Sequence, residues 1–560
     1  MKILSLVSFL LFSFFFIDFS NSREVRKFGK RKQFNNELIR NTKFGSVEGT
    51  KKITDDGDVL VWYNIPYAEE PTGNLRWAAP VDPQPWNNIL DCTVPGEVAL
   101  QMDSDNIIGT EDCLNLDIYA PKNAKKLPVM VYIHGGNNQT GESKELKGND
   151  IVIRNNVIYI SINYRLGIFG FNILPALHTE AGSTGNYALL DMAKALDWIK
   201  NNVKEFGGDP NNITISGFSA GGRDVMAMLI SPLFAKKFHK AIVFSGGMTI
   251  ADVNDSIKRT ASAVAPLAVE DNMAATEEEA KTWLMTDGMD VKEWLYSVSS
   301  ERLCALMGNA GIRMSVFPHL FNDGVVIPEE GFSTSKWNDV PVLMLTGSTE
   351  FSFFNLGSGI WYTPSAFALG TDLQPAKDFA CTYGSDMYRI FNAQSSAEKM
   401  FNKYKSDIYV CQVDFGAQNS GYPIEVVGSF HGIFIPMLSN DNTYSDIYDF
   451  ESSEYQDMAA IFNKQLKNFL RRGNPNEKGN SDWKPWTPSQ PLSMVLDAVD
   501  GKATAQCKNV STSFAEIISR MEDDISVSDN GKTLAITNVL NGRWFSEPVD
   551  EYYNNPSLWE

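Results

Sequence analysis

The chain lacks any long apolar stretch after its first 22 residues, so none of the remaining sequence is expected to span a bilayer. It also lacks an excess of basic residues, because 49 Lys and Arg stand against 68 Asp and Glu, for a net charge of −19. This charge argues against a nucleic-acid partner or an anionic membrane surface, and we interpret it as a source of solubility. Internal repeats and low-complexity tracts are absent too. The oligomeric state stays open.

The first 22 residues have the features of a secretory signal peptide. Lys2 precedes a continuous apolar stretch, and Ser20 and Ser22 are small residues that suit cleavage. Residues 23–44 are expected to form a basic N-terminal arm, with a processed pro-segment as the alternative. Residues 521–560 are assigned to a C-terminal extension. The mature protein is therefore expected to be secreted, with no transmembrane anchor.

Apolar and amphipathic segments alternate along the rest of the chain. Residues 129–133 and 157–162 are nearly continuous apolar runs, as expected for strands of a buried parallel sheet. Apolar residues recur at helical spacing over 186–203 and over 454–472, and each stretch is followed by glycine. Residues 251–335 are rich in helical patterns and are expected to form an insertion. The alternation predicts an α/β fold with a large, mainly parallel central sheet flanked by helices.

The most specific local signal is the pentapeptide at residues 217–221, which has the pattern G-x-S-x-G around Ser219. A short β-branched segment at 212–216 precedes it, and a helical pattern follows at 222–229. Strand, tight turn and helix in this order form a nucleophile elbow, which lifts the serine hydroxyl above the sheet. The pentapeptide alone is common by chance and fits a surface turn. Its flanking pattern favours a nucleophilic serine.

Further segments resemble the type-B carboxylesterase family, which includes cholinesterases and bile-salt-activated lipases. They lie at residues 64–77, 111–119, 163–167, 185–186 and 206–210. The resemblance covers residues 45–520, which we treat as one domain. It implies an α/β-hydrolase fold with a helical insertion and a serine-dependent ester hydrolysis.

A serine hydroxyl is a weak nucleophile that needs a base, and the base needs an orienting acid. Histidine is scarce, and the candidates for the base are His134, His178, His239, His319 and His431. In this fold the chain order is serine, acid, histidine, which excludes the two histidines before Ser219. By resemblance His431 is the base, and Glu350, in a loop after a strand, is the acid. Each residue alone fits a structural role, but the three in this order favour a triad.

The tetrahedral intermediate of ester hydrolysis needs backbone N–H donors. By resemblance, the donors are Gly136, Asn137 and Ala220, on the loop after one strand and at the residue after the nucleophile. Asn137 departs from the family, which has glycine or alanine there, and its side chain could crowd the acyl pocket. If the loop requires a positive φ, asparagine tolerates it better than most residues.

Three other positions stand out beside the proposed triad. Ser245 resembles a family serine that hydrogen-bonds the acid, and a strand-end cap is the equally favoured alternative. Phe218 replaces the acidic residue common before the nucleophile. Arg223 replaces a residue that is usually small, and the sequence offers no account of it.

Six cysteines in a secreted chain indicate disulfides. By resemblance, Cys92 pairs with Cys113, and Cys411 pairs with Cys507. Two further cysteines, Cys304 and Cys381, have no clear family counterpart and either pair together or stay free. Asn254 and Asn509 are the better candidates for N-glycosylation, with Asn138 as a further sequon.

Cholinesterases bind choline through a tryptophan in the loop between the first two cysteines. Residues 93–112 contain no Trp, Tyr or Phe, and Phe218 removes the nearby carboxylate, so a choline ester is disfavoured. The sequence predicts a secreted serine esterase for uncharged carboxylic esters, acting on a small-molecule substrate without metal or other cofactor. A non-catalytic adhesion or storage member of the family is one alternative, and a lipase for acylglycerols is another.

Overall fold

The computed structural model describes residues 37–54, 56–178, 184–309, 318–357, 359–416, 428–442, 444, 450–538 and 547–554. The predicted signal peptide and most of the predicted basic arm lie outside these residues.

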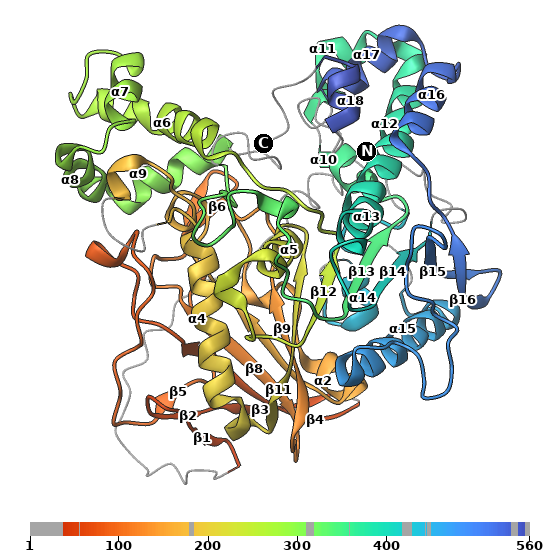
Figure 1. Ribbon diagram of the computed structural model, residues 1–560, viewed down its shortest axis with the longest axis horizontal. Helices are drawn as coiled ribbons and strands as arrows, with labels where there is room; N and C mark the ends of the chain where they lie inside the picture. Colours follow the sequence, from red (N-terminus) through yellow and green to blue (C-terminus); the bar gives the residue numbers. More distant parts are fainter. Residues whose placement is uncertain are drawn as a thin grey trace, which may run out of the picture.

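Within the described residues, eleven strands form one large sheet in the order β16-β15-β14-β13-β12-β11-β9-β10-β8-β4-β3 (Figure 1). Its strands are β3 (Thr50–Thr54), β4 (Gly57–Pro66), β8 (Asn115–Pro121), β9 (Leu127–Ile133), β10 (Ile158–Ile162), β11 (Gly208–Phe218), β12 (Lys240–Phe244), β13 (Val342–Gly347), β14 (Ile408–Val413), β15 (Leu492–Val499) and β16 (Lys502–Asn509). Neighbours pair in parallel from β10 across to β15 and antiparallel at both ends. The expected large, mainly parallel sheet is confirmed, with antiparallel margins.

Short strands form two small additional sheets. They are β1 (Ile39–Asn41), β2 (Ser46–Glu48) and β5 (Leu90–Asp91) in one sheet, and β6 (Gln101–Asp103) and β7 (Asn106–Ile108) in the other. The helices are α2 (Asn149–Asn155), α3 (Gly167–Gly170), α4 (Tyr187–Asn202), α5 (Ala220–Ile230), α6 (Val253–Glu270), α7 (Glu277–Leu284), α8 (Met289–Ser297), α9 (Ser300–Ala305), α10 (Phe351–Gly357), α11 (Pro364–Phe367), α12 (Leu373–Arg389), α13 (Ser395–Phe401), α14 (Phe434–Leu438), α15 (Ser453–Arg472), α16 (Phe514–Asp523), α17 (Asp529–Asn538) and α18 (Glu547–Tyr552).

Two apolar cores cover the two faces of the large sheet. One includes Met192 of α4 and Met228 of α5, and the other includes Ile151 of α2 and Phe462 of α15. Helix α15 matches the amphipathic helix expected at 454–472, and it ends at Gly473, whose φ of 73° is typical of a left-handed helix cap. The three layers therefore follow from the apolar pattern of the sequence.

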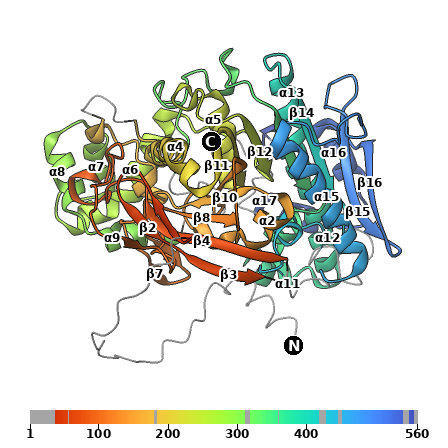
Figure 2. The ribbon, with the colours of Figure 1, turned by 90° about the horizontal axis from the view of Figure 1, so that it is seen from below.

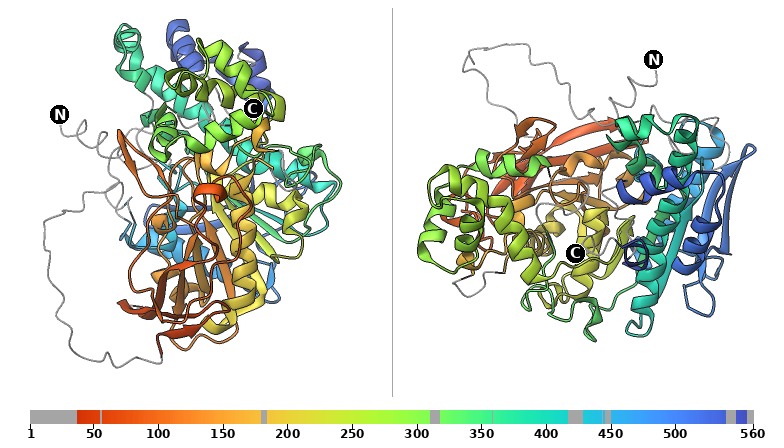
Figure 3. Two further views of the ribbon diagram at one scale, coloured as in Figure 1. Left: turned by 90° about the vertical axis from the view of Figure 1, so that its left-hand side faces the viewer. Right: turned by 90° about the horizontal axis from the view of Figure 1, so that it is seen from above.

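Two groups of helices lie at the same end of the sheet. Helices α6–α9 form one group, in the segment expected as an insertion, and α10–α12 with α16–α18 form the other (Figure 1). Figure 2 and the right-hand view of Figure 3 show the groups on opposite sides of the molecule. Each group has its own apolar core.

Both predicted margins of the domain contain ordered elements of the fold. Strand β1, in the last part of the predicted arm, pairs antiparallel with β2. In the predicted C-terminal extension, Met521, Ala535 and Val549 are buried in one core with Phe379 of α12. The described part of residues 521–560 therefore packs as part of the fold.

In the structure no disulfide joins any of the six cysteines, all of which lie among the described residues. The predicted Cys411–Cys507 disulfide is wrong, because Met494 of β15 pairs with Cys411 on one side and with Cys507 on the other. Two strand spacings of about 4.8 Å separate the two cysteines, well beyond the roughly 7 Å limit between bridged Cα atoms. Cys92 and Cys113 are both buried and unbridged in this structure, and their pairing stays a prediction.

Candidate active site

Ser219 lies at the sharp turn between β11 and α5. Its backbone has φ 54° and ψ −114°, outside the regions that ordinary residues favour, and its side chain is 8% exposed. Its N–H donates to the carbonyl oxygen of Phe244, at the end of the neighbouring strand β12, at 2.9 Å. The strand–turn–helix expected from the pentapeptide is thus present, with the serine at its apex.

Glycines allow this turn to pack tightly. A Cβ added to Gly217 would lie 2.1 Å from the carbonyl oxygen of Gly221, and one added to Gly221 would lie 2.2 Å from that of Ile133. Backbone atoms cannot yield as a flexible side chain does, so only glycine fits at both positions. The turn is held against the end of β9.

Glu350 and His431 form a buried pair near the same end of the sheet. Glu350 lies three residues after the end of β13, and His431 lies between Gly428 and Gly432, whose φ values are 119° and 109°. His431 Nδ1 lies 2.7 Å from Glu350 Oε2. Since a carboxylate accepts, Nδ1 carries the proton in this pair and Nε2 is left as the acceptor.

The second carboxylate oxygen of Glu350 is held by three donors. Oε1 accepts from the hydroxyl of Ser245 at 2.6 Å, from that of Thr346 at 2.8 Å and from the N–H of Gly347 at 2.5 Å. Of the two alternatives for Ser245, the structure has the hydrogen bond to the acid. These donors fix the carboxylate, which in turn fixes the ring of His431.

The hydrogen bond from Ser219 to His431 is not formed in this conformation. His431 Nε2 is buried and has no hydrogen-bond partner among the described residues. Hydrogen bonds of this kind are often long in enzymes without substrate and tighten when substrate binds. The ring nevertheless lies beside the nucleophile turn, because its centroid is 4.6 Å from that of Phe218.

Aromatic side chains surround His431. Besides Phe218, the rings of Phe354, Tyr388 and Phe353 lie 4.8, 5.5 and 6.1 Å from it, centroid to centroid. Phe218 therefore packs against the base where many relatives of the resembled family have an acid. Phe353 also reaches the candidate site.

From the sequence, asparagine is expected to suit the loop after β9 if this loop requires a positive φ, and the structure meets that condition. Gly136 has φ 92° and Asn137 has φ 57°, so a left-handed residue is required at the position where asparagine replaces glycine or alanine. Among the described residues, the N–H groups of Gly136 and Ala220 donate to no acceptor. They are free to bind an oxyanion.

A half-buried carboxylate anchors the start of this loop. Glu145 Oε2 accepts from the N–H of Gly135 at 3.0 Å and from the hydroxyl of Tyr132 at 2.8 Å. Burial raises the pKa of Glu145 to about 7. No local pattern in the sequence indicates this contact, because Glu145 lies ten residues beyond the glycine that it holds.

Arg223 is buried beside the candidate oxyanion loop. Its side chain is 2% exposed, and Nη1 lies 3.5 Å from Asn137 Oδ1. Burial lowers the pKa of the guanidinium. Arg223, whose role the sequence did not explain, therefore lies close to Ser219.

One glycosylation candidate is wrong. Asn138 has no exposed surface, and its amide donates to Asp224 Oδ1 at 2.9 Å while its oxygen accepts from Tyr164. A fully buried amide nitrogen has no room for a glycan. Asn254 and Asn509 are exposed and remain candidates.

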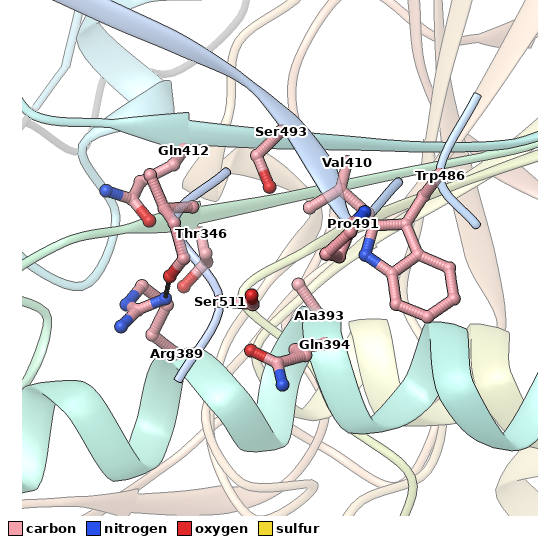
Figure 4. A pocket seen from close by; sticks show the side chains of 11 residues that line it. Thr346, Arg389, Ala393, Gln394, Val410, Gln412, Trp486, Pro491, Ser493 and Ser511 are labelled. Atoms are coloured by element: carbon pink, nitrogen blue, oxygen red, sulfur yellow. Dashed lines mark hydrogen bonds between the residues drawn. The ribbon is translucent and has the colours of Figure 1, made fainter. Parts of the chain in front are cut away.

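A small pocket, with a volume of about 20 Å³, lies beside β13 and β14 (Figure 4). Thr346 lines it and also donates to Glu350, so this residue links the cavity to the acid. Arg389, a cationic residue that lines this pocket, is already hydrogen-bonded. It donates to the carbonyl oxygen of Val510 at 2.6 Å and to Asp386 at 3.2 Å. We assign no function to this cavity.

Among the residues that the structure describes, no helix combines the length and the hydropathy of a membrane-spanning segment. In the same part of the chain, no group of three or more His, Cys, Asp or Glu side chains is placed to hold a metal ion.

The parallel sheet, the turn at the end of β11 and the helices on both faces define an α/β-hydrolase fold. A solved structure of a PNB esterase has the same fold, with a TM-score of 0.66 and 24% sequence identity over 87% of this chain and 100% of that one. The chain belongs to the carboxylesterase family, a family of carboxylic-ester hydrolases, because the family pattern matches residues 36–359, more than half of its length.

Individual relatives agree with this assignment. The chain is 32% identical to para-nitrobenzyl esterase of Bacillus subtilis (strain 168) over 57% of this chain and 64% of that protein. It is 39% identical to fumonisin B1 esterase of Sphingopyxis macrogoltabida over 38% and 40%, and 29% identical to carboxylesterase 1D of Rattus norvegicus over 79% and 86%. The match thus spans less than two thirds of the first two relatives and most of the third.

Proposed function

We propose that this protein is a secreted serine esterase that hydrolyses uncharged carboxylic esters through Ser219, His431 and Glu350. The observation that carries the proposal is the buried His431–Glu350 hydrogen bond of 2.7 Å beside the strained turn of Ser219. It supplies a base whose free nitrogen is available to a serine proton. Secretion rests on the apolar stretch of the first 22 residues.

The first half of the reaction forms an acyl-enzyme. Ser219 Oγ attacks the ester carbonyl carbon while His431 Nε2 takes the hydroxyl proton. The carbonyl oxygen becomes an oxyanion, which the N–H groups of Gly136, Asn137 and Ala220 stabilise. When the intermediate collapses, the alcohol leaves with the proton from His431.

The second half repeats these steps with water. His431 takes a proton from water, the hydroxide attacks the acyl-enzyme carbonyl, and the same N–H groups hold the oxyanion. Collapse releases the carboxylic acid and returns the proton to Ser219. Glu350 stays ionised throughout and stabilises the imidazolium that forms in each half.

Hydrolysis of nitrophenyl esters of increasing acyl length tests the proposal. The purified wild-type chain should hydrolyse some of them, and Ser219→Ala should lower kcat by on the order of 10⁶. Ser453→Ala, at an exposed serine of α15, is the matched control and should behave as wild type. Undiminished turnover by Ser219→Ala would remove the serine from the mechanism, and a preference for long acylglycerols would indicate a lipase.

A second measurement tests the nature of the substrate. The rings around His431 are aromatic, and Phe218 stands where an acidic residue would supply a negative charge, so a choline head gains little there. kcat/KM for a neutral thioester should therefore exceed kcat/KM for acetylthiocholine. A clear preference for acetylthiocholine would reveal a cation site.

A further inference from the structure

Arg223 lies one helical turn after Ser219, the proposed nucleophile. Its N–H donates to the carbonyl oxygen of Ser219 at 3.0 Å, inside a helix, α5, whose residues are all buried. Large charged side chains are almost never fully buried unless they are paired or functional. The 2% exposure of Arg223 therefore calls for a partner.

The guanidinium joins two sides of the candidate active site. On one side, Nη1 lies 3.5 Å from Asn137 Oδ1, on the residue whose N–H is a proposed oxyanion donor. On the other side, Arg223 interacts electrostatically with the side chain of Tyr388, whose ring lies 5.5 Å from that of His431. A group bound to this guanidinium would lie within reach of the acyl part of an ester held at Ser219.

Among the described residues, no carboxylate lies within ion-pair distance of the Arg223 guanidinium, although the charge of the neighbouring Asp224 acts on it. The buried Nε has no hydrogen-bond partner there. The adjacent Asp224 gives one oxygen to Asn138, leaves its other oxygen unpartnered, and has its pKa raised to about 7 by burial. A buried charge without a partner is costly, and an anionic ligand would relieve that cost.

We propose that Arg223 makes this esterase selective for esters with a carboxylate at the far end of the acyl chain, that is, for monoesters of dicarboxylic acids. The proposal rests on the serine chemistry of the proposed function, since it takes Ser219 to attack a carbonyl held by Asn137. It departs from that function in the substrate, which carries one negative charge at the far end of its acyl chain instead of being uncharged. An acyl chain that runs past the Asn137 side chain brings its terminal carboxylate to the guanidinium. Arginine binds a carboxylate through two parallel N–H···O bonds, and the unpartnered Nε offers one of them.

A purely structural Arg223 makes a different prediction. If it only held Asn137 in the left-handed conformation, removing it would slow the hydrolysis of every ester by the same factor. Selectivity is therefore measured as a ratio, which a general loss of activity leaves unchanged.

The test compares kcat/KM for monoethyl glutarate with kcat/KM for ethyl 5-methylhexanoate, whose branched end has the shape of a carboxylate without its charge. The wild type should prefer the monoester. In Arg223→Met, which keeps the length of the side chain, the ratio should fall by about 10- to 100-fold, the effect of losing a hydrogen bond to a charged group. Arg223→Lys, which keeps the charge but loses the planar fork, should lie between them.

Arg471→Met, at an exposed arginine near the end of α15, is the control and should keep the wild-type ratio. A wild type without preference for the monoester, or an unchanged ratio in Arg223→Met, would overturn the inference while esterase activity itself persists. Failure of the wild type to hydrolyse either ester would instead overturn the proposed function. If Arg223→Met does not fold, glutarate must still inhibit wild-type hydrolysis of the neutral ester competitively and more strongly than 5-methylhexanoate, and equal inhibition contradicts the inference.

Discussion

Glu350 is fully buried, yet both of its oxygens are occupied. Oε1 accepts from Ser245, Thr346 and Gly347, and Oε2 accepts from His431. A buried carboxylate is tolerated when donors surround it in this way. Every one of these donors points an N–H or O–H at an oxygen, so an uncharged amide cannot replace the carboxylate without conflict.

We therefore expect Glu350→Gln to lower kcat by about 10⁴, because the amide no longer fixes the proton on His431 Nδ1. Circular dichroism should still show a folded chain. Glu398→Gln, at an exposed glutamate of α13, provides the control. A Glu350→Gln variant within tenfold of the wild type would assign the orienting acid to another residue.

The sequence could predict the residues that lie in motifs, and it missed those that depend on packing. Ser219 is predicted from its motif and the flanking pattern, and Glu350 and His431 are predicted from chain order together with the family resemblance. Tyr388 reaches His431 only because α12 packs over the end of the sheet, and Arg223 acquires its place only from the approach of the loop after β9 to α5. Such long-range contacts leave no local pattern.

At the scale of elements, the loop after β9 is held by a carboxylate that titrates near neutrality. Glu145 binds the N–H of Gly135, next to the proposed oxyanion donor Gly136. Its pKa is raised from 4.5 to about 7 by burial, so between these values the folded chain binds more protons than the unfolded chain. The stability that the neutral carboxyl contributes is present at low pH and is lost as the pH rises through 7.

This predicts a pH-dependent difference between the wild type and Glu145→Gln. The glutamine keeps an oxygen for Gly135 and Tyr132 but does not ionise, so its stability lacks this slope. From pH 4.5 to pH 7.5, the free energy of unfolding of the wild type should fall relative to the variant by up to about 3 kcal/mol. Urea unfolding at both pH values measures it, and parallel curves for the two proteins would contradict the assignment.

Strand order is the element-scale feature that the sequence could not supply. The alternation of apolar runs predicted a mainly parallel sheet, and the sheet confirms it. The Cys411–Cys507 pairing failed because β15 lies between the strands that carry the two cysteines. A family resemblance suggests which cysteines pair. Whether they lie close enough depends on which strands are neighbours, and the whole sheet determines that.

At the scale of the molecule, the last helices complete a core that reaches the candidate active site. Helices α16–α18 share apolar contacts with α12, and Tyr388 at the end of α12 contacts His431. The residues assigned from the sequence to a C-terminal extension are thus expected to support both stability and the site.

Two isoleucines of this segment form a matched test. Ile536 is 6% exposed and Ile525 is 97% exposed. Ile536→Ala should lower the free energy of unfolding by roughly 2–5 kcal/mol through the cavity that it leaves, and Ile525→Ala should change it by less than about 0.5 kcal/mol. Equal effects in urea unfolding would mean that residues 521–560 do not belong to the core.

The central claim is that Ser219 is the nucleophile, and covalent labelling tests it most directly. The wild-type chain is treated with a diethylphosphoryl organophosphate, and the adduct is located by peptide mass spectrometry while residual esterase activity is followed. The account predicts a single adduct on Ser219 whose extent matches the loss of activity, and no adduct in Ser219→Ala. Complete inactivation with the label on another residue, or full activity with Ser219 fully labelled, would contradict it.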